Sequence, residues 1–252
     1  MLTIAIPAFN RQHYLKQVLD VFETAPFNLD IFCRLTTRIV VSFDRWIEPD
    51  LKPLLNYTCI DQIIAHRARH GHTLGITRHV QWLLQHSIAQ GSSHVLLLED
   101  DCVPILNWQE VIGASLRRND YVFALHPDCY QVRTDYTKDD IGKTNTSLRT
   151  SSWGVLLSAR AIRDLSYFAS IEEYDWDFSL NRLLDATGTR HNGGIQCSTI
   201  PVVKHIGVVG QHFDEKSYPS VLNDVYTSAE RAYEEYKCAI NQPLNIAASQ
   251  SS

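Results

Sequence analysis

The sequence predicts an α/β fold with a mostly parallel central sheet flanked by helices. Short apolar runs that end in polar or charged residues alternate with longer segments in which apolar residues recur at helical spacing. This order is typical of strand–helix–strand units, in which a helix carries the chain back between parallel strands. The chain has 252 residues, of which 44% are hydrophobic and 20% charged, so it can bury the core of one large domain.

The first half of the chain contains four predicted strands, and an amphipathic helix is predicted after the first strand and after the third. The strands cover residues 2–6, 37–43, 60–65 and 94–98. Each helix has apolar residues three or four positions apart: Tyr14, Leu15, Val18, Leu19 and Phe22 in the first, and Ile76, Val80, Leu83, Leu84 and Ile88 in the second, which covers 74–88.

The second half is less regular. Strands are predicted over 121–125, 153–157 and 200–203, helices over 159–168, 174–184 and 221–236, and a polar loop over 135–150. We expect a single domain over 1–238. The segment after Asn241 lacks charge and periodicity, so residues 239–252 are predicted to form a flexible tail.

The overall charge argues against a nucleic-acid-binding protein. The formal net charge is −5, and acids and bases are interspersed without a basic run. Apolar runs fall short of the roughly 20 residues that a transmembrane helix needs, and a strand that begins at Leu2 leaves no room for a signal peptide before it.

Cysteine usage favours a reducing compartment. The six cysteines are widely scattered and form no Cys-x-x-Cys pair, which fits reduced, partly buried thiols better than a secreted disulfide framework or a zinc ribbon. We therefore expect a cytoplasmic protein, soluble or peripheral to a membrane. A lumenal domain separated from its anchor would have the same sequence features.

Polar residues follow all four strands of the first half. Because the carboxyl ends of parallel strands meet at one edge of a sheet, where ligands of open α/β sheets bind, we expect these residues to converge on one crevice. They are Asn10-Arg11, Asp44-Arg45, His66-Arg67 and Glu99-Asp100-Asp101.

The acidic cluster is the strongest of these signals. The run Val95-Leu96-Leu97-Leu98 ends directly in Glu99, Asp100 and Asp101. Adjacent carboxylates at the end of a buried strand are hard to keep ionised without a cation, and carboxylate oxygens suit Mg²⁺ or Mn²⁺. The alternative is a solvated acidic turn in which Glu99 or Asp100 caps backbone groups.

Five segments follow one another along the chain: the Arg-His-x-x-Trp helix at 78–82, the strand and Glu-Asp-Asp turn at 95–104, the Gly-containing strand at 149–157, the Trp-Asp segment at 174–177, and a glycine loop at 205–213. Together, and in matching order over residues 1–216, they resemble the N-acetylglucosaminyltransferase I family of GT-A fold nucleotide-sugar glycosyltransferases. The chain departs from the family at Phe178, where a second acid is usual, at Val208-Val209-Gly210, where the family loop carries a serine, and in lacking the extra C-terminal domain.

The resemblance implies a GT-A (Rossmann-like) fold with a smaller acceptor-side subregion, and a metal-dependent inverting glycosyltransferase. It implies that Asp101 binds Mn²⁺ or Mg²⁺, that Asp100 faces the ribose and that Glu99 faces the donor sugar. It further implies that Arg11, Asp44 and His79 surround the uracil of a UDP-sugar, with N-acetylglucosamine as the suggested sugar. For Asp44 the alternative is an ion pair with Arg45, and for His79 a structural role in its helix.

Inversion requires a general base that takes a proton from the acceptor hydroxyl. Asp177 is the candidate, because the bulky neighbours Trp176 and Phe178 can desolvate it and raise its pKa. Asp175 is the rival; on a helix the two side chains point about 200° apart, so at most one faces the site. Both acids could instead stabilise the start of a helix.

The segment from His205 to Gly210 supplies the last candidate element. Neutral histidine can bind Mn²⁺, which makes His205 a further candidate ligand, and Gly207 and Gly210 permit close backbone approach to a diphosphate. The alternative is a simple turn between strand and helix.

Two other functions remain open from the sequence. A sugar-phosphate nucleotidyltransferase shares strand-end acids, but its Gly-rich basic loop is replaced here by Pro7-Ala8-Phe9-Asn10-Arg11. A non-catalytic carbohydrate- or nucleotide-binding module is the second alternative. Retention of the acidic cluster and a candidate base favours the glycosyltransferase, with a carbohydrate or another hydroxyl compound as acceptor.

Overall fold

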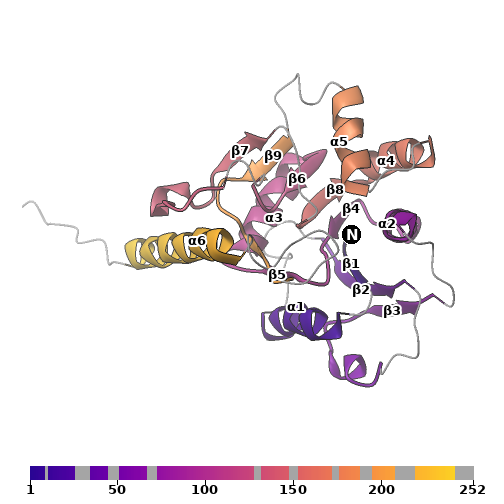
Figure 1. Cartoon of the computed structure of the whole chain (residues 1–252), viewed down its shortest axis with the longest axis horizontal. Helices are drawn as coiled ribbons and strands as arrows, with labels where there is room; N and C mark the ends of the chain where they lie inside the picture. Colours follow the sequence, from indigo (N-terminus) through magenta and orange to yellow (C-terminus); the bar gives the residue numbers. More distant parts are fainter. Residues whose placement is uncertain are drawn as a thin grey trace, which may run out of the picture.

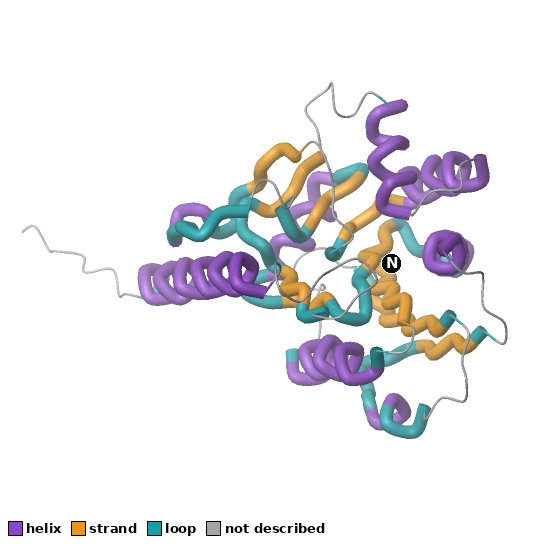
Figure 2. Tube along the Cα trace, in the orientation of Figure 1, coloured by secondary structure: helices purple, strands orange, loops and turns teal. Residues whose placement is uncertain are grey.

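The computed structural model describes residues 1–8, 11–25, 35–44, 51–66, 73–127, 132–147, 153–171, 176–187, 195–207 and 219–241. Within these ranges an eight-stranded sheet forms the centre of the molecule, with helices on both faces (Figure 1). Figure 2 shows the strands of this sheet as one twisted band between the helices. The predicted α/β architecture is therefore confirmed.

The sheet is mostly parallel. Its strand order is β3-β2-β1-β4-β8-β6-β9-β7, and only β8 and β7 run against the other strands. The strands are β1 (Leu2–Ala8), β2 (Thr37–Phe43), β3 (Gln62–Ala65), β4 (His94–Leu97), β6 (Val122–Ala124), β7 (Thr144–Ser147), β8 (Val155–Ser158) and β9 (Ile195–Ser198). A separate antiparallel ribbon consists of β5 (Cys102–Pro104) and β10 (Val203–His205).

Alternating side chains of the central strands pack into two different cores. In β1, Ile4 and Ile6 belong to one hydrophobic cluster, whereas Ala5 between them belongs to the other. The first cluster includes α1 (Gln12–Thr24), α3 (Trp108–Arg118) and Tyr226 of α6 (Pro219–Ile240). The second includes α2 (Thr73–Ala89), α4 (Ala159–Ile171) and α5 (Trp176–Ala186). Both faces of the central strands are thus buried, which explains their nearly continuous apolar runs.

Several elements differ from the sequence prediction. The predicted loop 135–150 contains a short 3₁₀ helix, η3 (Lys138–Asp140), and the edge strand β7, whose residues are mostly exposed and so lack an apolar pattern. The predicted strand 200–203 is wrong in its position: strands lie on either side, at β9 and β10. Ile200 and Val202 are buried but are not part of a strand. Their apolar side chains therefore indicate burial and not strand structure.

Further elements were not predicted. They are α3, β5, β9 and a second 3₁₀ helix, η2 (Leu54–Asn56). Helix α6 extends to Ile240, so the first residues of the predicted tail are helical; residues 242–252 lie outside the described ranges. None of the described helices has the length and hydropathy needed to cross a bilayer.

The parallel strands bring the candidate residues to one edge of the sheet. Strands β1, β2 and β4 are adjacent and parallel, and Arg11, Asp44 and the acidic cluster follow their carboxyl ends. The β5–β10 ribbon continues from this edge toward α6, so its two strands add residues from both halves of the chain (Figure 1).

Candidate functional site

Asp101 lies at the centre of the candidate site. After β4 the chain turns sharply, and the backbone N–H of Cys102 donates to the Glu99 carbonyl at 3.0 Å. The Asp101 carbonyl accepts from the N–H of Ile206 at 2.8 Å, which ties the turn to the end of β10. Asp100 is 1% exposed and Asp101 is 0% exposed. Two adjacent carboxylates are therefore held out of water and require positive charge nearby.

Arg11 supplies that charge. It is the residue before α1, and its two terminal nitrogens donate separately, Nη1 to Asp101 Oδ2 and Nη2 to Asp100 Oδ1. Burial of the guanidinium acts to lower its pKa, but the nearby carboxylates outweigh burial and hold the pKa above its usual value. The guanidinium thus acts as an internal cation at the end of β4.

His205 approaches Asp101 from the other side. The register of the ribbon pairs His205 with Cys102, and His205 Nε2 lies 3.4 Å from Asp101 Oδ2. Burial alone would raise the pKa of Asp101. The hydrogen bond and charge of His205, together with the charge of Arg11, instead hold that pKa below its usual value. Asp101 is therefore kept ionised, as a cation ligand must be.

The backbone of Gly207 lies in close contact with the same carboxylate. A Cβ atom built on Gly207 would lie 2.1 Å from Asp101 Oδ2 and 2.9 Å from its Cγ. Both are far inside van der Waals contact, so only glycine fits this position without moving the carboxylate. The predicted close approach of Gly207 is thus directed at Asp101 in the described structure.

Gly207→Ala is expected to disturb the Asp101 carboxylate while leaving the sheet intact. The added methyl group cannot coexist with the present Asp101 rotamer, so we expect Mn²⁺ affinity to fall by about tenfold or more, an effect of ~1.4 kcal/mol. Mn²⁺ binding is measured by calorimetry. Gly142→Ala is the control for the added methyl group, because its Cβ meets nothing within 4 Å; unlike Gly207, Gly142 has a positive φ, so its variant also shows the effect of backbone strain alone. Equal metal affinity in wild type and Gly207→Ala would contradict the prediction.

Three aromatic residues that sequence reasoning did not assign to the site support His205. The Trp153 ring stacks on the His205 ring with centroids 4.9 Å apart, and the backbone N–H of His205 donates to the Tyr226 hydroxyl at 3.0 Å. His126 Nδ1 donates to the Pro127 carbonyl at 2.7 Å, which leaves Nε2 to accept from Tyr226 at 3.3 Å. These contacts fix the ring and backbone of His205 and come from segments far apart in sequence.

Glu99 lies in a different environment from its two neighbours. Burial of Glu99 is the main reason that its pKa is raised to about 8. The charges of Asp101, Asp100 and Asp177 raise this pKa further, and the charge of Arg11 opposes them. Glu99 is therefore protonated at neutral pH and able to donate a hydrogen bond. The influence of Asp177 on this pKa also means that Asp177, in the first turn of α5, lies near the acidic cluster.

The donor set at the turn suits a hard divalent cation. Ligand atoms of Glu99, Asp101 and Cys102 lie within 4.8 Å of one another. Burial raises the pKa of the Cys102 thiol well above its usual value, so Cys102 stays protonated and offers no thiolate. The remaining donors are the ionised Asp101 carboxylate and an oxygen of the Glu99 carboxyl group, with the His205 side chain beside them, and these oxygen and nitrogen donors fit Mn²⁺ or Mg²⁺.

Two of the residues expected around a nucleotide base lie next to β2: Asp44 follows its end, and His79 of α2 contacts it. Asp44 is 5% exposed, and its backbone N–H donates to the Ala8 carbonyl at 3.2 Å, which joins the ends of β1 and β2. His79 of α2 is buried, with Nε2 2.8 Å from Ser42 Oγ. His66 packs edge-on against the His79 ring at 5.4 Å. His79 thus has a structural hydrogen bond to β2, whereas Arg11 contacts Asp100 and Asp101.

Two predicted site residues, Asp175 and Gly210, lie outside the described residues. The described structure brings Arg11, Glu99, Asp100, Asp101, His205 and Gly207 together at one edge of the sheet, with Asp177 nearby. Asp44 follows the end of the strand next to β1, and His79 is on the helix behind it.

Comparison with known proteins supports the fold. No protein-family model matches the chain, and no curated protein matches it significantly in sequence. Among solved structures, the crystal structure of S. aureus TarS, residues 1–349, matches with a TM-score of 0.51 and 11% identity. The match covers 98% of this chain and 75% of the TarS chain. TarS is a glycosyltransferase, so the chain has a glycosyltransferase-like, GT-A-like fold; the match does not single out the N-acetylglucosaminyltransferase I family.

Proposed function

We propose that this chain is a metal-dependent inverting glycosyltransferase that transfers a sugar from a UDP-sugar to an acceptor hydroxyl. The observation that carries the proposal is the buried Asp101 carboxylate after the end of β4. It accepts a hydrogen bond from Arg11, lies next to His205 Nε2 and contacts the backbone of Gly207. The fold likeness to TarS, a glycosyltransferase, supports glycosyl transfer as the reaction class. The sequence resemblance suggests N-acetylglucosamine as the sugar.

The main requirement of this reaction is stabilisation of the negative charge on the leaving nucleotide. As the glycosidic bond to phosphate breaks, the diphosphate gains negative charge that must be stabilised. A bound Mn²⁺ or Mg²⁺ would supply a Lewis acid for that charge, held by Asp101 with His205 as a further ligand. Arg11 now neutralises Asp100 and Asp101, and a cation at Asp101 would free its guanidinium to contact the donor.

The neighbouring residues bind the rest of the donor in this proposal. Asp100 accepts hydrogen bonds from the ribose, and the protonated Glu99 carboxyl donates to a hydroxyl or carbonyl oxygen of the sugar. Asp44, Arg11 and His79 surround the uracil, where a carboxylate can accept the imide N–H. Backbone groups at Gly207 and Gly210 approach the diphosphate, since neither residue has a side chain to obstruct it.

Asp177 is the proposed general base, with Asp175 as the alternative. It lies in the first turn of α5, beside the buried Trp176, and its charge acts on Glu99. A carboxylate there can take the proton of an acceptor hydroxyl as that hydroxyl attacks the anomeric carbon. The same position also stabilises the helix start, so structural and catalytic roles are compatible.

We propose a cytoplasmic or membrane-peripheral location. The cysteines Cys59, Cys102, Cys197 and Cys238 are free thiols in the described structure, which is typical of a reducing compartment.

A UDP-release screen tests the proposed activity. Purified protein is incubated with individual UDP-sugars, Mn²⁺ and a panel of hydroxyl acceptors, and UDP is measured with and without chelator. We expect chelator-sensitive UDP release with at least one UDP-sugar. Pyrophosphate release from a nucleoside triphosphate and a sugar phosphate would instead favour a nucleotidyltransferase. Metal-independent sugar binding without any UDP release would favour a binding module.

A further inference from the structure

Helix α6 contributes a buried tyrosine to the surroundings of the candidate site. Tyr226 is 2% exposed, and its hydroxyl accepts a hydrogen bond from the backbone N–H of His205 at 3.0 Å. His205 is the last residue of β10, and its Nε2 lies 3.4 Å from Asp101 Oδ2. Because Tyr226 contacts the backbone of His205, it fixes the end of β10 and therefore how far the imidazole reaches toward the carboxylate.

The preceding residue of β10 also contacts α6. Lys204 Nζ lies 5.5 Å from the centre of the Tyr226 ring and 3.9 Å from a carboxylate oxygen of Glu230. Both charged side chains are partly exposed, so these two contacts contribute little free energy. They show, however, that two consecutive residues of β10 lie against the same tyrosine, one on its ring and one on its hydroxyl.

His126 determines the direction of the Tyr226 hydroxyl proton. The Pro127 carbonyl accepts from His126 Nδ1–H at 2.7 Å, so Nε2 of the neutral ring accepts from the Tyr226 hydroxyl at 3.3 Å. With its proton directed at His126, the Tyr226 oxygen presents its lone pairs to the His205 N–H. The His126 side chain is 0% exposed, and buried polar groups lose free energy when they have no partner.

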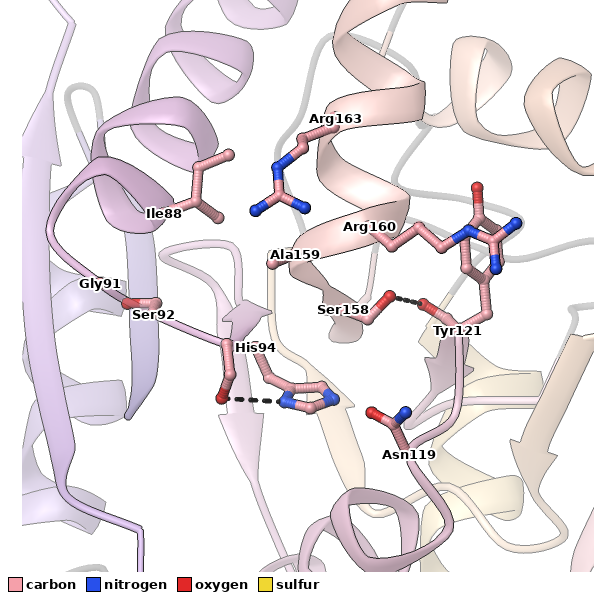
Figure 3. A pocket seen from close by; sticks show the side chains of 11 residues that line it. Ile88, Gly91, Ser92, His94, Asn119, Tyr121, Ser158, Ala159, Arg160 and Arg163 are labelled. Atoms are coloured by element: carbon pink, nitrogen blue, oxygen red, sulfur yellow. Dashed lines mark hydrogen bonds between the residues drawn. The ribbon is translucent and has the colours of Figure 1, made fainter.

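Trp153 contacts the rings of both histidines. It stacks on His205 with centroids 4.9 Å apart and meets the His126 ring edge-on at 4.8 Å. Strands β6 and β8 are antiparallel, so His126, which follows β6, lies beside Trp153, which precedes β8. At the opposite end of this strand pair, beside the pocket in Figure 3, Ser158 Oγ donates to the Tyr121 carbonyl at 3.1 Å. The strand pair is therefore fixed at both ends.

We propose that Tyr226 and His126 are positioning residues that set the affinity of Asp101 and His205 for a divalent cation. This inference rests on the proposed function, in which Asp101 and His205 bind Mn²⁺ or Mg²⁺. Apolar packing of α6 alone would need only a ring at position 226, and phenylalanine would supply it. The hydroxyl instead links three buried groups whose donors and acceptors match, and the group at one end of this chain is the backbone of a candidate metal ligand.

Two matched tyrosine variants test the proposal. Tyr226→Phe removes the hydroxyl and keeps the ring. Tyr136→Phe is the control, because Tyr136 is also 2% exposed and its hydroxyl also accepts from a backbone N–H, that of Arg133 at 3.2 Å, which is outside the candidate site. We expect calorimetry to show Mn²⁺ binding weakened by about tenfold in Tyr226→Phe and unchanged in Tyr136→Phe.

Two variants of His126 separate its hydrogen bond from its packing. Glutamine has an amide oxygen that can accept from the Tyr226 hydroxyl, whereas phenylalanine fills the space without an acceptor. We expect His126→Gln to keep most of the wild-type Mn²⁺ affinity and His126→Phe to weaken Mn²⁺ binding as much as Tyr226→Phe does. The double variant His126→Phe/Tyr226→Phe should bind Mn²⁺ no more weakly than Tyr226→Phe, because both residues act through the same hydrogen bond. Additive losses would contradict this chain of contacts.

Nitrogen NMR of histidine-labelled protein gives a second readout that needs neither metal nor turnover. In Tyr226→Phe we expect faster hydrogen exchange at the His205 amide and a shifted His205 Nε2 resonance, and in Tyr136→Phe neither change. An unmoved Nε2 resonance, or equal Mn²⁺ affinity in the two tyrosine variants, would overturn the positioning role alone. Failure of wild type to bind Mn²⁺ would overturn the proposed metal-dependent function and this inference with it.

Discussion

Asp101→Asn is expected to lower the rate of sugar transfer by about a thousandfold and to abolish metal-stimulated UDP binding. Asparagine has nearly the same shape, but it removes the negative charge on which Arg11, His205 and the proposed cation depend. Loss of the cation removes several kcal/mol of stabilisation from the departing diphosphate. Turnover is measured as UDP release at saturating donor, and UDP affinity by calorimetry with and without Mn²⁺.

The matched control for this variant is Asp139→Asn, an exposed acid of η3 that is not part of the candidate site. Asp101→Asn also leaves the Arg11 guanidinium less well neutralised, which could affect folding. Circular dichroism is therefore used to check that both variants fold. Retention of full turnover and of metal-dependent UDP binding by Asp101→Asn would refute the assignment of Asp101 as the metal ligand.

The convergence of the strand ends was predictable because it depends on local patterns. An apolar run that stops at a polar residue identifies both a buried strand and its end, and parallel topology then brings the ends together. Arg11, Asp44 and Glu99 were placed at the same edge in this way, and the structure has them after the adjacent strands β1, β2 and β4.

The partners within the site were not predictable from such patterns. The family resemblance implied uracil contacts for Arg11, and in this structure its guanidinium contacts Asp100 and Asp101, about ninety positions later in the chain. The contacts that fix His205 come from Trp153, Tyr226 and, through Tyr226, His126. These residues belong to three distant segments, so a local sequence pattern cannot predict that they pack together. Charge complementarity alone would not have selected Arg11 among the many arginines of the chain.

The elements that were not predicted have two different causes. Helix α3 has an amphipathic pattern, so the sequence does contain its signal, whereas β7 is an exposed edge strand without an apolar face. Polar edge strands are specified by backbone pairing with their neighbour, here β9, and not by side-chain burial.

Asp177→Asn is expected to lower kcat by about a thousandfold while UDP affinity and its dependence on Mn²⁺ remain unchanged. Asparagine keeps the size and helix-start position of the side chain but cannot accept the proton of the acceptor hydroxyl. The donor contacts of Arg11 and Asp101 are unaffected in this prediction, so the loss must appear in kcat and not in donor binding. Asp185→Asn, an exposed acid at the other end of α5, is the control.

The split between kcat and donor affinity separates the catalytic role of Asp177 from a structural one. If Asp177 only stabilises the start of α5, its replacement lowers the melting temperature and leaves kcat of the folded enzyme near wild type. If Asp175 is the base, Asp175→Asn gives the kinetic defect and Asp177→Asn does not.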